Sequence, residues 1–217
     1  MNFRAVQRLQ RFPSWALALR LAWLIVLPAI GCLFGGCASR FPKDAAGQVL
    51  PASGERVDRL ARDIAALDPA FDAAEAQAVA RASMDASRQL ANDYRMVRPA
   101  FVHSILVNTR LRRRGLCYHW ADDLTERLGE WKHQTLRLYR VVSGMNTPRE
   151  HNALVVAPVL RPMRAGLVLD GWRTGGELHW IRVGEDRKYR WVLRQDLQWL
   201  REQIEPKSGI DPSEVSH

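Results

Sequence analysis

Cysteine is scarce in this sequence, and its three copies are unevenly placed. Cys32 and Cys37 lie in the N-terminal segment, which leaves Cys117 as the single thiol of the remaining chain. One thiol cannot build an internal disulfide framework, so the class of small disulfide-stapled domains is excluded. A lone thiol in an oxidising compartment is a liability unless it is buried or used. We therefore expect Cys117 either to be buried in the core or to take part in chemistry.

Acidic residues are absent from the first 36 positions. Four arginines precede the apolar run 21–27, which is the order found in a secretory signal peptide. Gly35 and Gly36 stand directly before Cys37. The lipoprotein signal peptidase requires such small residues immediately before the cysteine. We therefore predict that residues 1–36 are a lipoprotein signal peptide and that Cys37 carries the lipid.

Two alternatives to this processing stay open. Cys32 also follows a glycine, although Pro28 and Ala29 occupy positions where the motif usually has larger aliphatic residues. A plain N-terminal membrane anchor is the other interpretation, because residues 15–34 approach the roughly 20 apolar residues that span a bilayer. A lipid at Cys37 would place the protein in the bacterial cell envelope, anchored to a membrane and facing the periplasm.

The formal net charge of +9 falls to +5 once the four signal arginines are set aside. A modest positive excess suits a protein that faces anionic lipid or cell-wall polymer. The sequence has no zinc-type cysteine pairs, RNA-binding aromatic signature or basic-region zipper. We therefore expect no nucleic-acid partner.

The remaining chain divides into a tether, a domain and a tail. Residues 37–54 are rich in Gly, Pro and Ser and have little periodicity, which favours a flexible tether. Residues 55–205 carry the periodic patterns of a single domain, ending in an amphipathic piece at about 197–204. Residues 206–217 form a polar tail, and no repeat is visible anywhere.

Helical patterns come first in this domain, and strand patterns follow. Asp72 and Glu75 resemble a capping box at the start of a helix that reaches about Tyr94. Two further helices are predicted at 57–64 and around 105–111. After Gln134 the pattern changes to short apolar runs separated by turn residues, at 136–142, 153–156, 167–169, 178–181 and 189–192. Helices followed by strands predict an α+β fold with a mainly antiparallel sheet.

Cys117 opens a segment whose apolar residues Ala121, Leu124 and Leu128 recur at helical spacing, and Gly129 supplies a stop. We expect Cys117 in the first turn of this helix, where free backbone NH groups and the helix dipole favour a thiolate. On its own, a single cysteine on an apolar helix face is more often a small buried hydrophobic residue.

A thiolate enzyme also needs a base within hydrogen-bond reach and an acceptor that orients this base. His151 stands at the entry of strand 153–156, and Asp170 closes strand 167–169. If these strands are antiparallel neighbours, the two residues meet at one end of the sheet. Taken singly, such a histidine is more often structural and an Asp before glycine is more often a turn former. The three positions together favour a catalytic site.

Three short motifs carry a family resemblance, namely Gly-Leu-Cys117-Tyr-His-Trp-Ala, Glu-His151-Asn-Ala-Leu-Val-Val and Leu-Val-Leu-Asp170-Gly-Trp. In this order they resemble the Cys, His and Asp motifs of the transglutaminase-like branch of the papain-like cysteine enzymes. The resemblance covers roughly residues 108–180. It implies a papain-like or transglutaminase-like core, with Cys117 as nucleophile, His151 as general base and then acid, and Asp170 as the orienting acceptor.

The oxyanion donors are less clear than the triad. Papain-like enzymes often place a glutamine shortly before the cysteine, whereas this chain has Leu-Arg-Arg-Arg at 111–114. The backbone NH of Cys117 is a candidate donor, and Asn108 is a second. Trp172, which follows Asp170 and Gly171, is a candidate to shield the site from water or to contact substrate. The chain also lacks the Asp-Cys-Ser-Gly motif of cell-wall endopeptidases, which argues against that subfamily.

Other charged and titratable residues have simpler interpretations. His103, His119 and His179 are weaker candidates for the base. A metal site of His119, His151 and Asp170 is conceivable, but no HExxH or comparable spacing supports it, so no metal is expected. The arginines at 110–114 are most simply a solvated face. Their functional alternative is a platform for an anionic substrate or a membrane surface.

The sequence thus predicts acyl transfer at a thiol, acting without a cofactor on an amide or peptide bond. The expected substrate is a peptide or protein, with cell-wall peptide as one candidate. Hydrolysis is favoured over cross-linking because of the expected envelope location. The alternative is an inactive lipoprotein that keeps this fold as a binding or assembly module.

Overall fold

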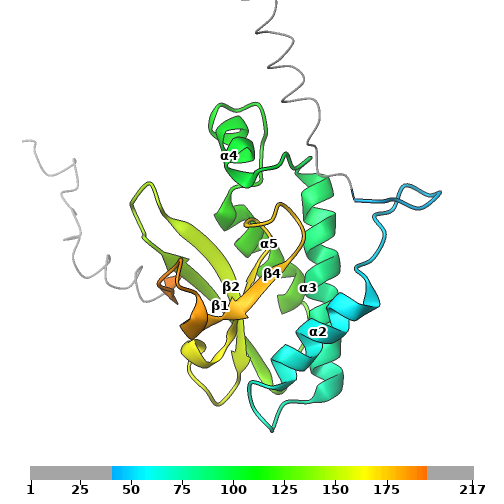
Figure 1. The fold of residues 1–217 in the computed structure, drawn as a ribbon, viewed down its shortest axis with the longest axis vertical. Coiled ribbons are helices and arrows are strands. Elements are labelled where there is room, and N and C mark those ends of the chain that lie inside the picture. The colour runs from blue at the N-terminus through cyan, green and yellow to red at the C-terminus, as the bar shows by residue number, and fades with distance from the viewer. Residues whose placement is uncertain (1–40, 195–217) are drawn as a thin grey trace, which may run out of the picture. The chain divides into compact units, whose positions relative to one another are not determined.

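The computed structural model describes residues 41–194 (Figure 1). The predicted signal peptide, Cys32, Cys37, the amphipathic piece at 197–204 and the polar tail lie outside these residues. None of the described helices is long and apolar enough to cross a membrane.

Four α-helices precede the sheet, and their bounds are α2 (Gly54–Ala65), α3 (Ala73–Asp93), α4 (Ala100–Asn108) and α5 (Cys117–Gly129). The predicted capping box at the start of α3 is only half formed. Asp72 accepts a hydrogen bond from the backbone nitrogen of Glu75 at 2.7 Å. The Glu75 carboxylate instead accepts from the backbone nitrogens of Gln134 and Thr135, each at 2.8 Å. Glu75 therefore connects the start of α3 to the chain that enters the first strand.

Helix α4 begins and ends earlier than its apolar pattern predicts. Pro99 stands at its N-cap, where a missing backbone NH costs nothing. Arg110 has a φ of 65°, a left-handed conformation that stops the helix before Leu111. Residues 109–114 are consequently a loop rather than the last turn of the helix.

Five antiparallel strands form one sheet in the order β4-β3-β2-β1-β5. Their bounds are β1 (Leu136–Ser143), β2 (His151–Pro158), β3 (Leu167–Asp170), β4 (His179–Arg182) and β5 (Val192–Leu193). The predicted α+β class with an antiparallel sheet is therefore confirmed. The last strand is shorter than the run 189–192 suggests, because Tyr189 and Trp191 pack beside His151 before β5 begins.

The central strand β2 is fully buried, and its alternate side chains serve two cores. Leu154 and Val156 face the core that the helices share with the sheet, together with Leu169 of β3. Val155 and its partner Val168 face the opposite, smaller core. The side-chain period of two in a strand thus decides which face every residue of β2 reaches.

Most of the predicted tether, from residue 41 on, folds onto the domain instead of remaining free. Phe41 and Ala52 are buried in the helical core, and Lys43 pairs with Val49 in an antiparallel bridge. Arg88 of α3 donates to the carbonyl of Pro51 at 2.8 Å. Residues 41–53 therefore pack as part of the domain because they carry buried apolar side chains, which composition alone did not indicate.

Candidate active site

Cys117 is the first residue of α5, and its thiol is half-buried and free. His119 fixes this helix start, because its Nδ1 accepts from the backbone nitrogens of Gly115 and Leu116, each at 3.2 Å. Trp120 is buried behind the thiol and donates to the carbonyl of Gly115 at 3.2 Å. His119 therefore caps the helix and has a structural task of its own.

The loop that leads to Cys117 is fastened by His103 of α4. His103 is fully buried, its Nδ1 accepts from the backbone nitrogen of Val97 at 3.2 Å, and its Nε2 donates to the carbonyl of Arg114 at 2.9 Å. Burial lowers the pKa of His103, which keeps the ring neutral in this arrangement. Gly115 has a φ of 121°, and a Cβ there would lie 2.2 Å from Nε2 of His103. Only glycine fits this position.

His151 and Asp170 reach the same place because strand pairing puts them on one face of the sheet. His151 shares its face with Val155, Asp170 shares its face with Val168, and these two valines are register partners. Nε2 of His151 lies 2.6 Å from Oδ2 of Asp170, and the two side chains are 2 % and 1 % exposed. The predicted meeting of the two strand ends is therefore present.

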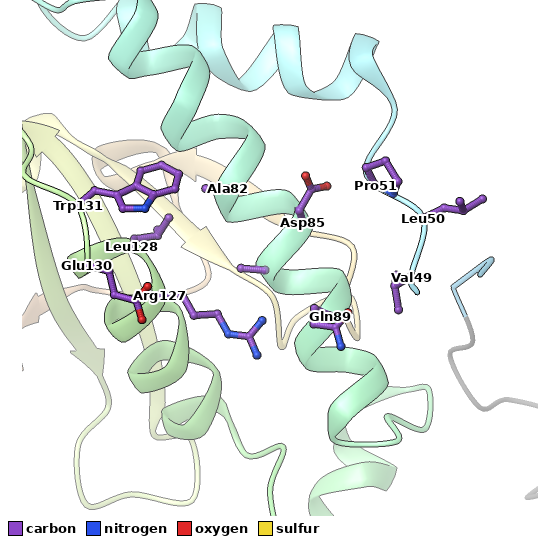
Figure 2. Close-up of a pocket in the computed structure, with 11 residues that line it drawn as sticks. Val49, Leu50, Pro51, Ala82, Asp85, Gln89, Arg127, Leu128, Glu130 and Trp131 are labelled. Atoms are coloured by element: carbon purple, nitrogen blue, oxygen red, sulfur yellow. The ribbon is translucent and has the colours of Figure 1, made fainter. Parts of the chain in front are cut away.

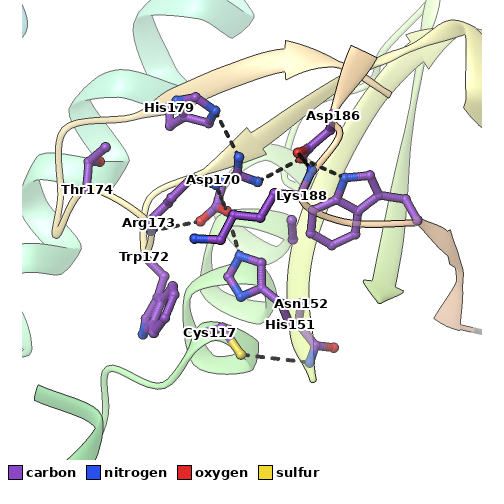
Figure 3. Close-up of polar contacts among 12 residues, drawn as sticks. Cys117, His151, Asn152, Asp170, Trp172, Arg173, Thr174, His179, Asp186 and Lys188 are labelled. Carbon is purple, nitrogen blue, oxygen red and sulfur yellow. Dashed lines mark hydrogen bonds and ion pairs between the residues drawn. The ribbon is translucent and has the colours of Figure 1, made fainter. Parts of the chain in front are cut away.

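The ring of His151 lies between Asp170 and Cys117 (Figure 3). Because Nε2 faces Asp170, Nδ1 is the ring nitrogen on the side of Cys117. Burial alone would lower the pKa of His151, but hydrogen bonds with Asp170 and Cys117 outweigh it and raise the pKa to about 9. At neutral pH the imidazole of His151 is therefore held in its protonated form beside the Cys117 sulfur.

Aromatic rings enclose His151 on its other sides. The ring centroids of Tyr189, Trp172 and Trp191 lie 4.4, 4.9 and 5.6 Å from that of the imidazole. Trp172 is anchored by its indole nitrogen, which donates to the Ser104 hydroxyl at 3.3 Å. Trp172 thus stands where it can shield His151 from water, as expected.

A buried charge network supports Asp170 and was not foreseen from the sequence. Arg173 donates from Nε to Oδ2 of Asp170 at 3.0 Å and from Nη2 to Asp186 at 2.8 Å. Trp191 also donates to Asp186, at 3.0 Å. Burial would raise the pKa of Asp170, but His151 and Arg173 lower it, so the carboxylate stays ionised. His179, a weaker base candidate, contacts Nη1 of Arg173 at 3.1 Å.

Asn152 is a further residue that was not predicted from the sequence. It follows His151 on β2, so its side chain points to the opposite face, where α5 lies. Its Nδ2 lies 4.0 Å from the sulfur of Cys117 and donates to Glu150 at 3.1 Å, while its Oδ1 accepts from Arg194 at 2.5 Å. Arg194 thereby fixes which end of the amide faces the thiol. Figure 3 shows this contact beside the His151 pair.

Asn108 is not brought to the thiol by any observed contact. It is exposed at the last position of α4 and makes no polar contact with Cys117 in the part of the chain that the structure describes. Asn152, and not Asn108, is therefore the asparagine whose side-chain amide lies near the thiol. The signal that could have identified it is its place directly after His151 in a buried strand.

Metal ligands and cavities were also compared with the positions of Cys117, His151 and Asp170. Within residues 41–194, no group of three His, Cys, Asp or Glu residues is arranged to hold a metal ion. A cavity of about 400 Å³ lies between α3, the end of α5 and segment 49–51. Figure 2 shows the residues that line it. Neither Cys117 nor His151 nor Asp170 lines it. This cavity is a consequence of how the N-terminal segment packs.

Comparison of the chain with protein-family models, with curated proteins and with solved structures found no significant match. The chemistry of the site therefore has to be inferred from its own geometry.

Proposed function

We propose that this protein is a cysteine hydrolase or acyltransferase that acts on an amide or peptide bond through Cys117, His151 and Asp170. The observation that carries the proposal is the buried contact of 2.6 Å between His151 and Asp170, with the second ring nitrogen directed toward a thiol at a helix start. A merely structural cysteine does not need an oriented, charged histidine beside it.

The first half-reaction forms a thioester. The Cys117 sulfur attacks the carbonyl carbon, and the carbonyl oxygen becomes an oxyanion. The backbone NH of Cys117, which has no partner within the first turn of α5, and Nδ2 of Asn152 donate to this oxygen. His151 then gives its Nδ1 proton to the leaving amine, which departs as the carbon–nitrogen bond breaks.

The second half-reaction releases the acyl group. His151, now neutral, accepts a proton from water or an incoming amine as this nucleophile attacks the thioester. The thiolate leaves, and the imidazolium forms again. Asp170 keeps the ring oriented throughout, since its carboxylate is held by both His151 and Arg173. The cycle needs no cofactor.

The order of the motifs and the arrangement of a helix-borne cysteine beside a histidine strand support a transglutaminase-like version of the papain-like core. The predicted lipid at Cys37 and the envelope location support a peptide or protein substrate outside the cytoplasm, such as cell-wall peptide. Water is then the most abundant acceptor, which favours hydrolysis over cross-linking.

Acyl-enzyme trapping tests the proposal. The full chain is mixed with p-nitrophenyl acetate, the initial burst of nitrophenolate is measured, and the modified cysteine is located by peptide mapping. We expect the size of the nitrophenolate burst to match the amount of acetylated Cys117. The burst should disappear in Cys117→Ala and in His151→Ala. Arg137→Gln, an exposed arginine of β1, serves as the matched control. A folded wild-type chain without acetylated Cys117 would instead support a binding or assembly module.

A further inference from the structure

The segment from Arg95 to Arg114 has a composition unlike the rest of the domain. It contains six arginines and no acidic residue, and it comprises α4 and the loop that follows it. Two of its arginines, Arg95 and Arg110, have positive φ values of 50° and 65°. The segment lies at one end of the domain, away from the sheet (Figure 1). It is outside the chemistry proposed for Cys117.

Large apolar side chains are exposed on this segment. Phe101 and Ile105 are 62 % and 55 % exposed, and their spacing of four residues puts them on one face of α4. Leu111 in the following loop is 66 % exposed. Ala100 and His103 are the buried residues of α4, whereas Phe101, Ile105 and Asn108 lie on its exposed side.

Arginines line a cavity that Leu111 also borders. The cavity has a volume of about 690 Å³, and its walls carry six arginines and two carboxylates. Asp93 pairs with Arg127, and Asp123 pairs with Arg114. The other four arginines have no carboxylate partner among the described residues, namely Arg95, Arg110, Arg112 and Arg113. Nε of Arg112 is buried without any hydrogen-bond partner. The lining of the cavity thus carries an excess of positive charge.

His103 anchors α4 and the loop after it by hydrogen bonds to the backbone on both sides. His103 joins α4 to the backbone of Val97 on one side and to the backbone of Arg114 on the other. The helix with its exposed apolar side chains and the loop with its arginines are therefore connected through one buried side chain.

We propose that Phe101, Ile105, Leu111 and the unpaired arginines, together called the α4 surface, bind a bilayer that contains anionic phospholipid. The apolar side chains would enter the acyl boundary while the guanidinium groups bind headgroup phosphates. A soluble polyanion would satisfy the arginines but would leave three large apolar side chains in water. The site is independent of the expected lipid at Cys37 and of catalysis.

Hydrogen exchange of the full chain on vesicles tests this proposal, with vesicles of phosphatidylcholine alone and of phosphatidylcholine mixed with phosphatidylglycerol. The four arginines of the N-terminal segment would also favour the anionic vesicles, so the readout is local exchange within residues 100–114. We expect this region to exchange at least about tenfold more slowly on the anionic vesicles. High salt should remove most of the difference, because the phosphate contacts are screened.

Two variants and their controls locate the effect. Ile105→Glu and Arg113→Glu change exposed side chains and should abolish the protection without changing thermal unfolding. The matched controls Leu160→Glu and Arg137→Glu, also at exposed positions, should retain it. Equal protection on both vesicle types, or loss of protection in the controls as well, would overturn the proposal. Equal protection by sodium tripolyphosphate alone would overturn the proposal in favour of a soluble anion. Protection that grows with protein concentration in the absence of lipid would overturn it in favour of a second copy of the chain.

Discussion

Arg173 holds Asp170 with two hydrogen bonds, one from its backbone nitrogen to Oδ1 and one from Nε to Oδ2, each at 3.0 Å. The same guanidinium bonds Asp186, so one half-buried arginine compensates two buried carboxylates. The carboxylate that orients His151 is therefore fixed by a residue only three positions further along the chain.

Removing this arginine should destabilise the domain. Arg173→Gln would leave Asp170 and Asp186 buried without their common cation, which typically costs about 3–5 kcal/mol in the free energy of unfolding. Chemical denaturation measures the loss. Arg137→Gln should change the stability by less than about 0.5 kcal/mol. An Arg173→Gln variant as stable as this control would show that the network contributes little.

The titration of His151 should be displaced upward. An NMR pH titration of the full chain should give His151 a pKa of about 9, and Asp170→Asn should lower it because the hydrogen-bonded carboxylate is lost. The raised pKa of His151 also makes the stability of the domain depend on pH. A pKa raised above the unfolded value of about 6.5 gives stabilisation that is complete below that pH and is lost as the pH rises through about 9. A ring that titrates near 6.5 in the wild type would contradict this.

Asn152 should act on the reaction rather than on the fold. Asn152→Ala removes the side-chain donor next to the sulfur, and losing one oxyanion donor typically slows acylation by about a hundredfold. Arg194→Gln should slow it less, because the amide loses only its orientation. Burst kinetics with p-nitrophenyl acetate measure both variants. Unchanged alkylation of Cys117 by iodoacetamide in Asn152→Ala would show that the thiol itself is intact.

The juxtaposition of Cys117, His151 and Asp170 could be predicted from the sequence because each of these residues lies at the end of a regular element. Cys117 begins a helix with a clear apolar face, and His151 and Asp170 bound short apolar strands. Antiparallel pairing then brings the strand ends together without any further information. The α+β class follows from the same two periodicities.

The supporting residues could not be predicted in this way, because their roles depend on which face or loop meets the site. Asn152 matters only because α5 covers its face of β2. Asp186 is far along the chain from Asp170, and only the return of the chain after β4 brings both to Arg173. The burial of Phe41 likewise depends on core residues that come from other elements.

Gly115 offers a test of how the thiol is positioned. Gly115→Ala would force a Cβ against the His103 ring and would strain a backbone with a φ of 121°, so we expect destabilisation of about 2 kcal/mol or more. Thermal unfolding measures this loss. Gly129→Ala is the control, because a Cβ there meets nothing within 4 Å. Equal effects of the two substitutions would mean that the contact with His103 does not constrain the loop.

The central claim is that His151 activates Cys117, and the alkylation rate of this thiol tests it most directly. The full chain is treated with iodoacetamide at about pH 6.5, and peptide mapping separates Cys117 from Cys32 and Cys37. An imidazolium partner favours the thiolate, which is the reactive form, so we expect wild-type Cys117 to react at least about tenfold faster than in His151→Ala. Arg137→Gln should match the wild type. Equal rates in wild type and His151→Ala, or a Cys117 that does not react in the folded wild type, would contradict the account.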